Sequence, residues 1–190
     1  MSQHPDQQSL PPEPGHKSAS TESHREESPD VVRCFVLTVS DTRTLETDRG
    51  GALIEELLLA NGHQVVGRQV VRDEIESIRG TVEQEMTGLS EPEIILVTGG
   101  SGIGPRDVSP EALRPLLTKE LPGFGEVFRV LSFEEVGAAT MLSRAFAGVI
   151  GRTLLFVLPG STNAVRLAME KLILPELGHL VREVRPERRK

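Results

Sequence analysis

Residues 93–107 read EIILVTGGSGIGPRD, a short apolar run followed by a loop rich in glycine. The run EIILVT has the length and composition of a buried β-strand, and SPEAL soon after the loop has the features of a helix start. Residues 98–107 contain four glycines, two hydroxyl side chains and one Arg–Asp pair. A glycine-rich turn between a strand and a helix can direct backbone N–H groups at phosphate oxygens.

The segments on both sides of this stretch alternate between strand and helix patterns. The apolar spacing and the stop signals predict further strands at residues 31–40, 63–71, 143–150 and 152–159, and helices at residues 50–62, 73–86, 109–117, 122–137, 161–174 and 175–184. Ser109 and Ser161 are expected to cap the helices that they begin. Because strands alternate with helices, we expect an α/β fold whose sheet is mostly parallel and covered on both faces.

The composition suits one domain with an extension. The chain has 190 residues, is 37% hydrophobic and lacks Trp and Tyr, so its core should consist mainly of Val, Leu and Ile. The single Cys34 excludes an intramolecular disulfide and a multi-cysteine metal site. Its place within a predicted strand favours a buried thiol over a nucleophile.

The charge and hydropathy exclude several classes of partner. A net charge of −7 argues against general nucleic-acid binding. No stretch approaches the roughly 20 apolar residues that span a bilayer, and no secretory signal is visible. We therefore expect no membrane partner and a cytoplasmic location.

The two ends of the chain differ from the middle. Residues 1–30 contain five prolines and only three apolar residues, so we expect a disordered N-terminal tail. The folded domain is predicted at residues 31–184. Residues 185–190 form a basic C-terminal tail, which we expect to be solvated.

The ends of the predicted strands carry most of the residues suited to binding. Ligands of parallel sheets bind beyond the carboxyl ends of the strands, where the chain segments meet at one edge. Glycines, hydroxyls and acids follow these ends, and the candidates are Ser40, Asp41, Asp73, Thr98, Gly99, Gly100, Ser101, Gly102, Pro159, Gly160 and Ser161. Ser143 with Arg144 could also reach an anionic ligand, or Arg144 could form a structural ion pair.

The loop TGGSG favours a phosphate site, although a tight strand-to-helix turn also requires glycine. It is not a P-loop, because no Gly-Lys-Ser/Thr follows. It is not a dinucleotide fingerprint, because Pro105 stands where the last glycine would be. For Ser161, helix capping and anion binding are both compatible with the sequence.

Two carboxylates near this loop suggest a metal ion. Asp107 lies in the loop segment and Asp73 at the neighbouring strand end, where they would repel a bound phosphate. Mg²⁺ resolves this conflict, because it prefers carboxylate and phosphate oxygens. Alternatively, Asp107 could pair with Arg106 or cap the next helix, and Asp73 could cap the second helix.

Several motifs in order resemble the MoaB/Mog family of molybdenum cofactor biosynthesis proteins, also known as molybdopterin-binding domains. The resemblance covers about residues 31–184, and its segments are VLTVSDTRT, VVRDE, ILVTGGSGIGPRDVSPEA, PGFGEVFRVLSFEEVG, MLSRAFAG and LPGSTNAVRLAMEKLILPELGHLV. The PGFGE and LPG segments resemble the MoaB branch most. The resemblance implies a three-layer α/β/α fold and a homo-oligomer, either a trimer or a hexamer, with other proteins of the pathway as possible partners.

The resemblance also implies an activity, which is Mg-ATP-dependent adenylylation of molybdopterin with release of pyrophosphate. The two acids of the family match Asp73 and Asp107, which would hold or orient Mg²⁺. The loop TGGSG would bind phosphate through its amides. Ser40, Asp41, Ser143 and the LPGS turn would help to hold the pterin or ATP.

Two other functions are compatible with the sequence. One is a non-catalytic molybdopterin-binding or scaffold protein of the same pathway, and the other is a nucleotide-binding module unrelated to pterin. The two carboxylates favour the enzyme, because a pure binder would gain little from negative charge beside a phosphate.

Overall fold

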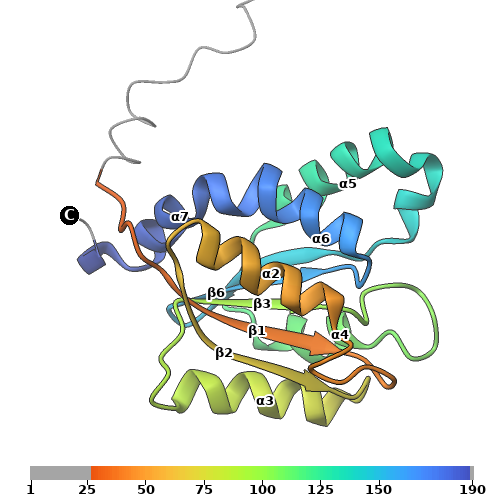
Figure 1. The fold of residues 1–190 in the computed structure, drawn as a ribbon, viewed down its shortest axis with the longest axis horizontal. Helices are drawn as coiled ribbons and strands as arrows, with labels where there is room; N and C mark the ends of the chain where they lie inside the picture. Colours follow the sequence, from red (N-terminus) through yellow and green to blue (C-terminus); the bar gives the residue numbers. More distant parts are fainter. Residues whose placement is uncertain (1–26, 189–190) are drawn as a thin grey trace, which may run out of the picture.

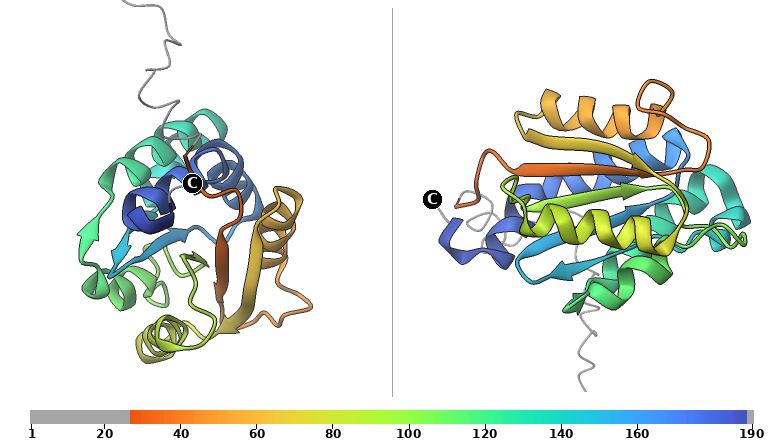
Figure 2. Two further views of the ribbon diagram at one scale, coloured as in Figure 1. Left: turned by 90° about the vertical axis from the view of Figure 1, so that its left-hand side faces the viewer. Right: turned by 90° about the horizontal axis from the view of Figure 1, so that it is seen from below.

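The computed structural model describes residues 27–188, which form a six-stranded sheet with helices on both faces (Figures 1 and 2). The strands are β1 (Arg33–Val39), β2 (Gln64–Val71), β3 (Ile94–Thr98), β4 (Lys119–Glu120), β5 (Phe146–Ile150) and β6 (Thr153–Leu158), in the order β2-β1-β3-β6-β5-β4. β2, β1, β3 and β6 are parallel, whereas β5 is antiparallel to β6 and β4 to β5. The prediction of an α/β fold with a mostly parallel sheet is confirmed.

The helices divide between the two faces of the sheet and complete the predicted three layers. One face carries α2 (Arg49–Ala60), α5 (Pro122–Val136), α6 (Thr162–Ala168) and α7 (Leu177–Val184). The other carries α3 (Ile75–Thr87) and α4 (Ser109–Leu113), which Figure 2 shows in front of the sheet in its right-hand view. Short helical turns follow several of these helices: η1 (Arg114–Leu116), η2 (Gly137–Leu142), η3 (Met169–Ile173), η4 (Leu174–Glu176) and η5 (Pro186–Arg188).

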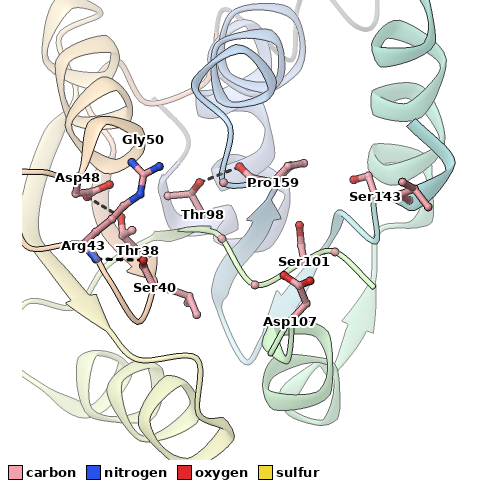
Figure 3. Close-up of a pocket in the computed structure, with 16 residues that line it drawn as sticks. Thr38, Ser40, Arg43, Asp48, Gly50, Thr98, Ser101, Asp107, Ser143 and Pro159 are labelled. Atoms are coloured by element: carbon pink, nitrogen blue, oxygen red, sulfur yellow. Dashed lines mark hydrogen bonds between the residues drawn. The ribbon is translucent and has the colours of Figure 1, made fainter. Parts of the chain in front are cut away.

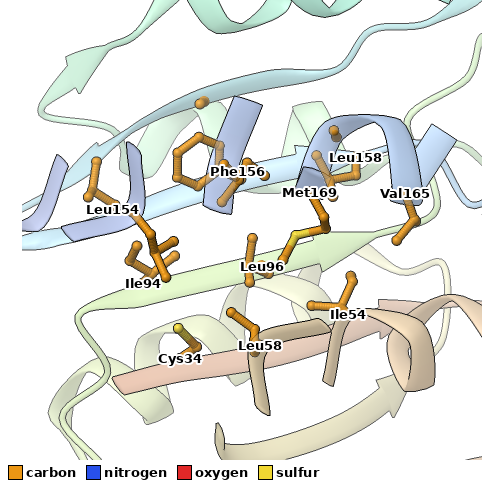
Figure 4. Close-up of a cluster of buried hydrophobic side chains, with 14 of the residues drawn as sticks. Cys34, Ile54, Leu58, Ile94, Leu96, Leu154, Phe156, Leu158, Val165 and Met169 are labelled. Carbon is orange, nitrogen blue, oxygen red and sulfur yellow. The ribbon is translucent and has the colours of Figure 1, made fainter. Parts of the chain in front are cut away.

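Alternate residues of the central strands fill two separate cores. In β1, Cys34 and Val36 face the α2 and α6 side, while Phe35 and Leu37 face the α3 side. Figure 4 shows the first core, where β3 and β6 pack against Ile54 of α2 and the helices that follow β6. Cys34 is fully buried and burial raises the pKa of its thiol, so the predicted structural role of this cysteine is confirmed.

Two predicted elements differ in detail from the structure. The helix predicted at residues 161–174 ends as α6 at Ala168 and continues through a π-helical turn and a 3₁₀ turn that contains Pro175. The strand predicted at residues 143–150 begins at Phe146 and runs antiparallel to β6. A tight turn at Gly151, where φ is +59°, joins β5 directly to β6, so no crossover helix can make the pair parallel.

The ends of the described chain pack against the domain. Glu27 pairs with the buried Arg182 of α7 at 2.6 Å, and Ser28 is buried beside Gly178. Most of the predicted N-terminal tail, residues 1–26, lies outside the described residues. The prediction of a solvated C-terminal tail needs a correction at Arg188, because its Nε donates to the buried carboxylate of Glu93 at 2.6 Å.

Among residues 27–188, no helix combines the length and the apolar character that a membrane crossing requires.

Candidate functional site

A pocket of about 440 Å³ opens at the carboxyl ends of β1, β3 and β6 (Figure 3). Because these three strands are parallel and adjacent, the loops that follow them meet at one edge of the sheet, as predicted. The pocket is lined by Thr38, Val39, Ser40, Arg43, Asp48, Gly50, Thr98, Gly99, Gly100, Ser101, Gly102, Asp107, Leu142, Ser143, Pro159 and Gly160. Ten of the residues predicted for the site are in this lining.

The first two glycines of the β3–α4 loop are required by the path of the backbone. Gly99 and Gly100 have φ values of +102° and +61°, which side-chain-bearing residues rarely adopt. A Cβ on Gly99 would lie 2.2 Å from the carbonyl oxygen of Val39, and a Cβ on Gly100 would lie 2.5 Å from Ser109 Oγ. The loop therefore turns tightly against β1 and α4 and presents bare backbone to the pocket.

Side chains hold both ends of this turn. Thr98 Oγ1 donates to the carbonyl of Pro159 at 2.9 Å, which links the ends of β3 and β6. Ser109 Oγ donates to the carbonyl of Gly99 at 2.8 Å, and the Ser109 N–H donates to the carbonyl of Gly100 at 2.9 Å. The prediction that Ser109 is a helix cap is wrong, because Val108 is the cap residue and the Ser109 side chain is used by the loop.

Arg144 holds the far side of the loop. Its Nε donates to the carbonyl of Gly102 at 2.6 Å, and its NH2 group donates to the carbonyl of Asp107 at 2.7 Å. Its remaining amino group pairs with Glu111 of α4, and the guanidinium lowers the pKa of that carboxyl. Of the two alternatives for Arg144, the structure shows the ion pair, and it adds a role in positioning the loop.

The two candidate metal-binding carboxylates lie against the glycines of the loop. A Cβ on Gly102 would be 2.7 Å from Asp107 Oδ2, and a Cβ on Gly100 would be 3.1 Å from Asp73 Oδ1. Asp107 Oδ2 accepts the N–H of Gly104 at 2.8 Å. Within residues 27–188, neither carboxylate has an ion pair with a basic side chain. Burial and the negative charges of Asp41 and Asp107 raise the pKa of Asp73.

Asp41 differs from these two carboxylates, because Arg106 neutralises it. Arg106 donates to both oxygens of Asp41, at 2.9 Å from Nε and 2.8 Å from NH2. These bonds lower the pKa of Asp41. The alternative that Arg106 pairs with Asp107 is therefore wrong, and so is the alternative that Asp73 caps α3, because Glu74 precedes that helix. Arg106 instead joins the β1 loop to the β3 loop.

Three of the predicted residues lie outside the lining. Asp41 lines an adjoining cleft, and Asp73 lies beside Gly100 at the edge of the pocket. Ser161 Oγ accepts the N–H of Ala164 at 3.3 Å, which confirms its prediction as the cap of α6.

The pocket also contains residues that sequence reasoning did not assign to it, among them Thr38, Arg43, Asp48 and Leu142. Asp48 is 2% exposed and caps α2 by accepting the N–H of Gly51 at 2.9 Å. It also accepts the hydroxyl of Thr38 at 2.7 Å. The alternation of side chains along β1 was the available signal for Thr38, because it lies on the same side as Ser40.

Hydroxyl groups line the pocket beside the loop. Ser101 is 3% exposed, and its hydroxyl has no hydrogen-bond partner within the described residues. Figure 3 shows Ser101 between the side chains of Thr98, Asp107 and Ser143. The arrangement combines backbone N–H groups, hydroxyls and two unpaired carboxylates, which suits a phosphate ligand together with a cation.

The two carboxylates are of the ligand type that Mg²⁺ prefers. Nucleotide-bound Mg²⁺ uses one or two protein carboxylates and takes its other oxygens from phosphate and water. Asp73 and Asp107 supply two such groups. Burial is the main cause of the raised pKa of Asp73, and a cation would offset the smaller contribution from the negative charges of Asp41 and Asp107. Residues 27–188 contain no group of three or more His, Cys, Asp or Glu side chains that could enclose a metal ion by themselves.

Comparison with known proteins gives the family. Residues 35–179 match the family model described as "Probable molybdopterin binding domain". The chain is 52% identical over 170 residues to molybdenum cofactor biosynthesis protein B of Halalkalibacterium halodurans, covering 89% of this chain and 99% of that protein. It is 49% identical over 172 residues to the Bacillus subtilis protein of the same name, with the same coverage.

Solved structures agree with this assignment. A crystal structure of molybdenum cofactor biosynthesis protein B superposes with a TM-score of 0.80 at 49% identity, covering 84% of this chain and 99% of that one. The tungsten cofactor synthesizing protein MoaB from Pyrococcus furiosus superposes with a TM-score of 0.73 at 38% identity, covering 83% and 99%. The chain therefore belongs to the MoaB/Mog family of molybdenum cofactor biosynthesis proteins.

Proposed function

We propose that this protein adenylylates molybdopterin with Mg-ATP and releases pyrophosphate. The observation that carries the proposal is the unpaired carboxylate of Asp107 against the glycine-rich loop, with Asp73 beside the same loop. A site for a phosphate alone would be disfavoured by these negative charges, whereas a site for phosphate with a divalent cation requires them.

The residues of the site would have two roles, which are phosphate binding and metal binding. The amides of the β3–α4 loop and the hydroxyl of Ser101 would contact phosphate oxygens, and Ser40 and Ser143 stand on opposite sides of the pocket to position the substrates. Asp73 and Asp107 would hold Mg²⁺. When bound, this ion would neutralise charge that develops on the phosphate oxygens.

The reaction requires little covalent chemistry from the protein. An oxygen of the terminal phosphate of molybdopterin bonds to the α-phosphorus of ATP, and the bond from that phosphorus to the bridging oxygen of the β-phosphate breaks. The products are adenylyl-molybdopterin and pyrophosphate. The attacking oxygen is already anionic, so no general base is needed, and positioning with electrostatic stabilisation is sufficient.

The direct test is incubation of the purified protein with molybdopterin, ATP and Mg²⁺, followed by assays for pyrophosphate and adenylylated pterin. We expect a product that requires both substrates and disappears when EDTA removes the metal. Absence of product from protein that still binds molybdopterin would replace the proposal with the non-catalytic binding role. Binding of nucleotide without measurable pterin affinity would support the unrelated nucleotide-binding module.

We also propose that the chain self-associates into a trimer or a hexamer, as the family resemblance implies. Exposed apolar side chains on α5 and η2 support this proposal, because a surface of that kind favours burial against another protein. They are Val127, Val130, Phe133, Val136 and Met141, with exposures between 47% and 74%. Light scattering coupled to gel filtration of wild type and Phe133→Glu is the test. Interaction with other proteins of the pathway and a cytoplasmic location stay predictions from the sequence.

A further inference from the structure

A second cleft of about 400 Å³ adjoins the pocket and contains unpaired positive charge. It lies between the loop that follows β1 and the carboxyl end of the edge strand β2, and its lining includes Ser40, Asp41, Arg43, Arg68 and Arg72. Ser40 and Arg43 line both the pocket and the cleft, so the two spaces share a wall. A ligand longer than the pocket could therefore extend into the cleft.

The three arginines of the cleft are not equivalent. Arg68 is used by the fold, because it pairs with Asp48 at 3.2 Å and with Glu55 at 2.9 Å. Within residues 27–188, the guanidinium groups of Arg43 and Arg72 have no ion pair or hydrogen bond with another side chain or a carbonyl. Arg43 is also the only basic residue among those that line the pocket. Arg43 can therefore contact an anion at the shared wall. The charge of Arg72 also helps to lower the pKa of Asp41, but within residues 27–188 no hydrogen bond or ion pair fixes its guanidinium.

The one acid of the cleft does not oppose such an anion. Asp41 is bonded through both carboxylate oxygens to Arg106, which offsets its charge. At the shared wall, Ser40 Oγ accepts the N–H groups of Thr42 and Arg43, both at 3.3 Å. Its hydroxyl hydrogen has no acceptor within the described residues and can be donated to a ligand in either space.

We propose that this cleft is the subsite for the pyrophosphate end of the nucleotide, with Arg43 and Arg72 as its contacts. The inference rests on the proposed adenylylation, in which the α-phosphate lies over the glycine-rich loop and the β- and γ-phosphates must lie to one side of it. Guanidinium groups bind phosphate oxygens through two parallel N–H donors, and an oligophosphate carries enough charge to engage both arginines. Arg43 would contact the phosphate chain from the wall between the two spaces.

The test uses inorganic pyrophosphate as the probe in isothermal titration calorimetry with the full chain and Mg²⁺. We expect Arg43→Ala and Arg72→Ala each to weaken pyrophosphate binding about tenfold, and the double variant about 100-fold. Arg43→Lys should recover part of the loss, because it keeps the charge but not the paired donors. Arg49→Ala is the matched control, because this exposed arginine is close in sequence and lines neither space.

Kinetics provide a second readout. If the proposed adenylylation holds, Arg43→Ala and Arg72→Ala should raise the KM for ATP and the inhibition constant of the pyrophosphate product. The KM for molybdopterin should stay within about twofold of wild type. A loss of kcat with equal changes for both substrates would instead indicate a general defect and would overturn the subsite.

The two proposals fail in different ways. Pyrophosphate affinity within twofold of wild type in the double variant would overturn the subsite, even where adenylylation is intact. An equal loss in Arg49→Ala would also overturn it, because long-range charge would then explain the binding. Arginine-dependent pyrophosphate binding in a protein with no adenylylation would support the subsite and overturn the proposed function.

Discussion

Two carboxylates at opposite ends of β3 differ in the hydrogen-bond donors and basic partners that the chain provides for them. Glu93, directly before the strand, is 1% exposed, and it accepts Arg188 Nε at 2.6 Å and the N–H of Arg33 at 3.0 Å. Asp107, in the loop after the strand, accepts one backbone N–H, and within residues 27–188 no basic side chain pairs with it.

The difference separates a carboxylate that the fold pairs with its own donors from one that the fold leaves largely open. A buried carboxylate is costly unless donors from the same chain surround it, and Glu93 meets that condition. Asp107 lines an open pocket with most of its lone pairs unused, so water or a cation must complete it. Charged residues at the two ends of the sheet should therefore respond to substitution in opposite ways.

The largest effect should come from Asp107→Asn, which keeps the bond to Gly104 and removes the charge. We expect the proposed adenylylation to fall about 100- to 1000-fold, because the proposed cation would lose a ligand, while the urea midpoint stays near wild type. Glu56→Gln, an exposed carboxyl on α2, is the control and should keep full activity. Turnover at the wild-type rate by Asp107→Asn would contradict the proposal that this carboxylate holds a catalytic metal ion.

Glu93→Ala should reverse this pattern. The substitution leaves the Arg33 N–H without its acceptor and Arg188 without its partner, so we expect the free energy of unfolding to fall by about 2 kcal/mol. Adenylylation per folded molecule should stay near wild type, because the residue is at the other end of the sheet. Urea denaturation checks the first part, and a marked loss of specific activity would contradict the second.

Asp48→Asn tests which property of a carboxylate decides the effect of its substitution. The two properties are its position in the pocket and the pairing of its charge with donors of the same chain. Asp48 lines the pocket, but Thr38, Gly51 and Arg68 already use its oxygens. We expect the free energy of unfolding to fall by about 1 kcal/mol and adenylylation to fall by less than tenfold. An activity loss as large as that of Asp107→Asn would contradict this prediction. It would show that the position of a carboxylate in the pocket matters more than its bonds to donors of the same chain.

The smallest effect should be a gain in stability from Asp73→Asn. Because the pKa of Asp73 is raised in the folded protein, its ionised form opposes folding once the pH is above that pKa. At pH 7 the variant should be slightly more stable than wild type, because solvent screens much of the effect at this half-buried position. The difference should disappear well below pH 3.8, where the carboxyl is protonated in both states. Urea unfolding at both pH values checks this. A loss of stability at pH 7 would contradict the prediction.

Much of the fold was predictable from local patterns. The runs in β1, β3 and β6 are mostly apolar because both faces of each strand are buried, and they were located to within two residues. Gly99 and Gly100 were recognisable as a turn because their backbone angles exclude most other residues. The position of Asp73 and Asp107 beside the glycine-rich loop was predictable because they follow strand ends in a parallel sheet, and their role in binding stays a prediction.

The partners of the charged side chains were decided only by the tertiary structure. Arg144 holds the carbonyl of Gly102, which is 42 positions away in the sequence, and Arg106 pairs with Asp41 across 65 positions. The sequence also did not reveal that the guanidinium of Arg43 has no ion pair within residues 27–188. The type and spacing of residues predict burial and backbone angles, because these depend mainly on neighbouring positions in the sequence. The pairing of a charge depends on which distant segments the sheet brings together, and that is a property of the whole fold.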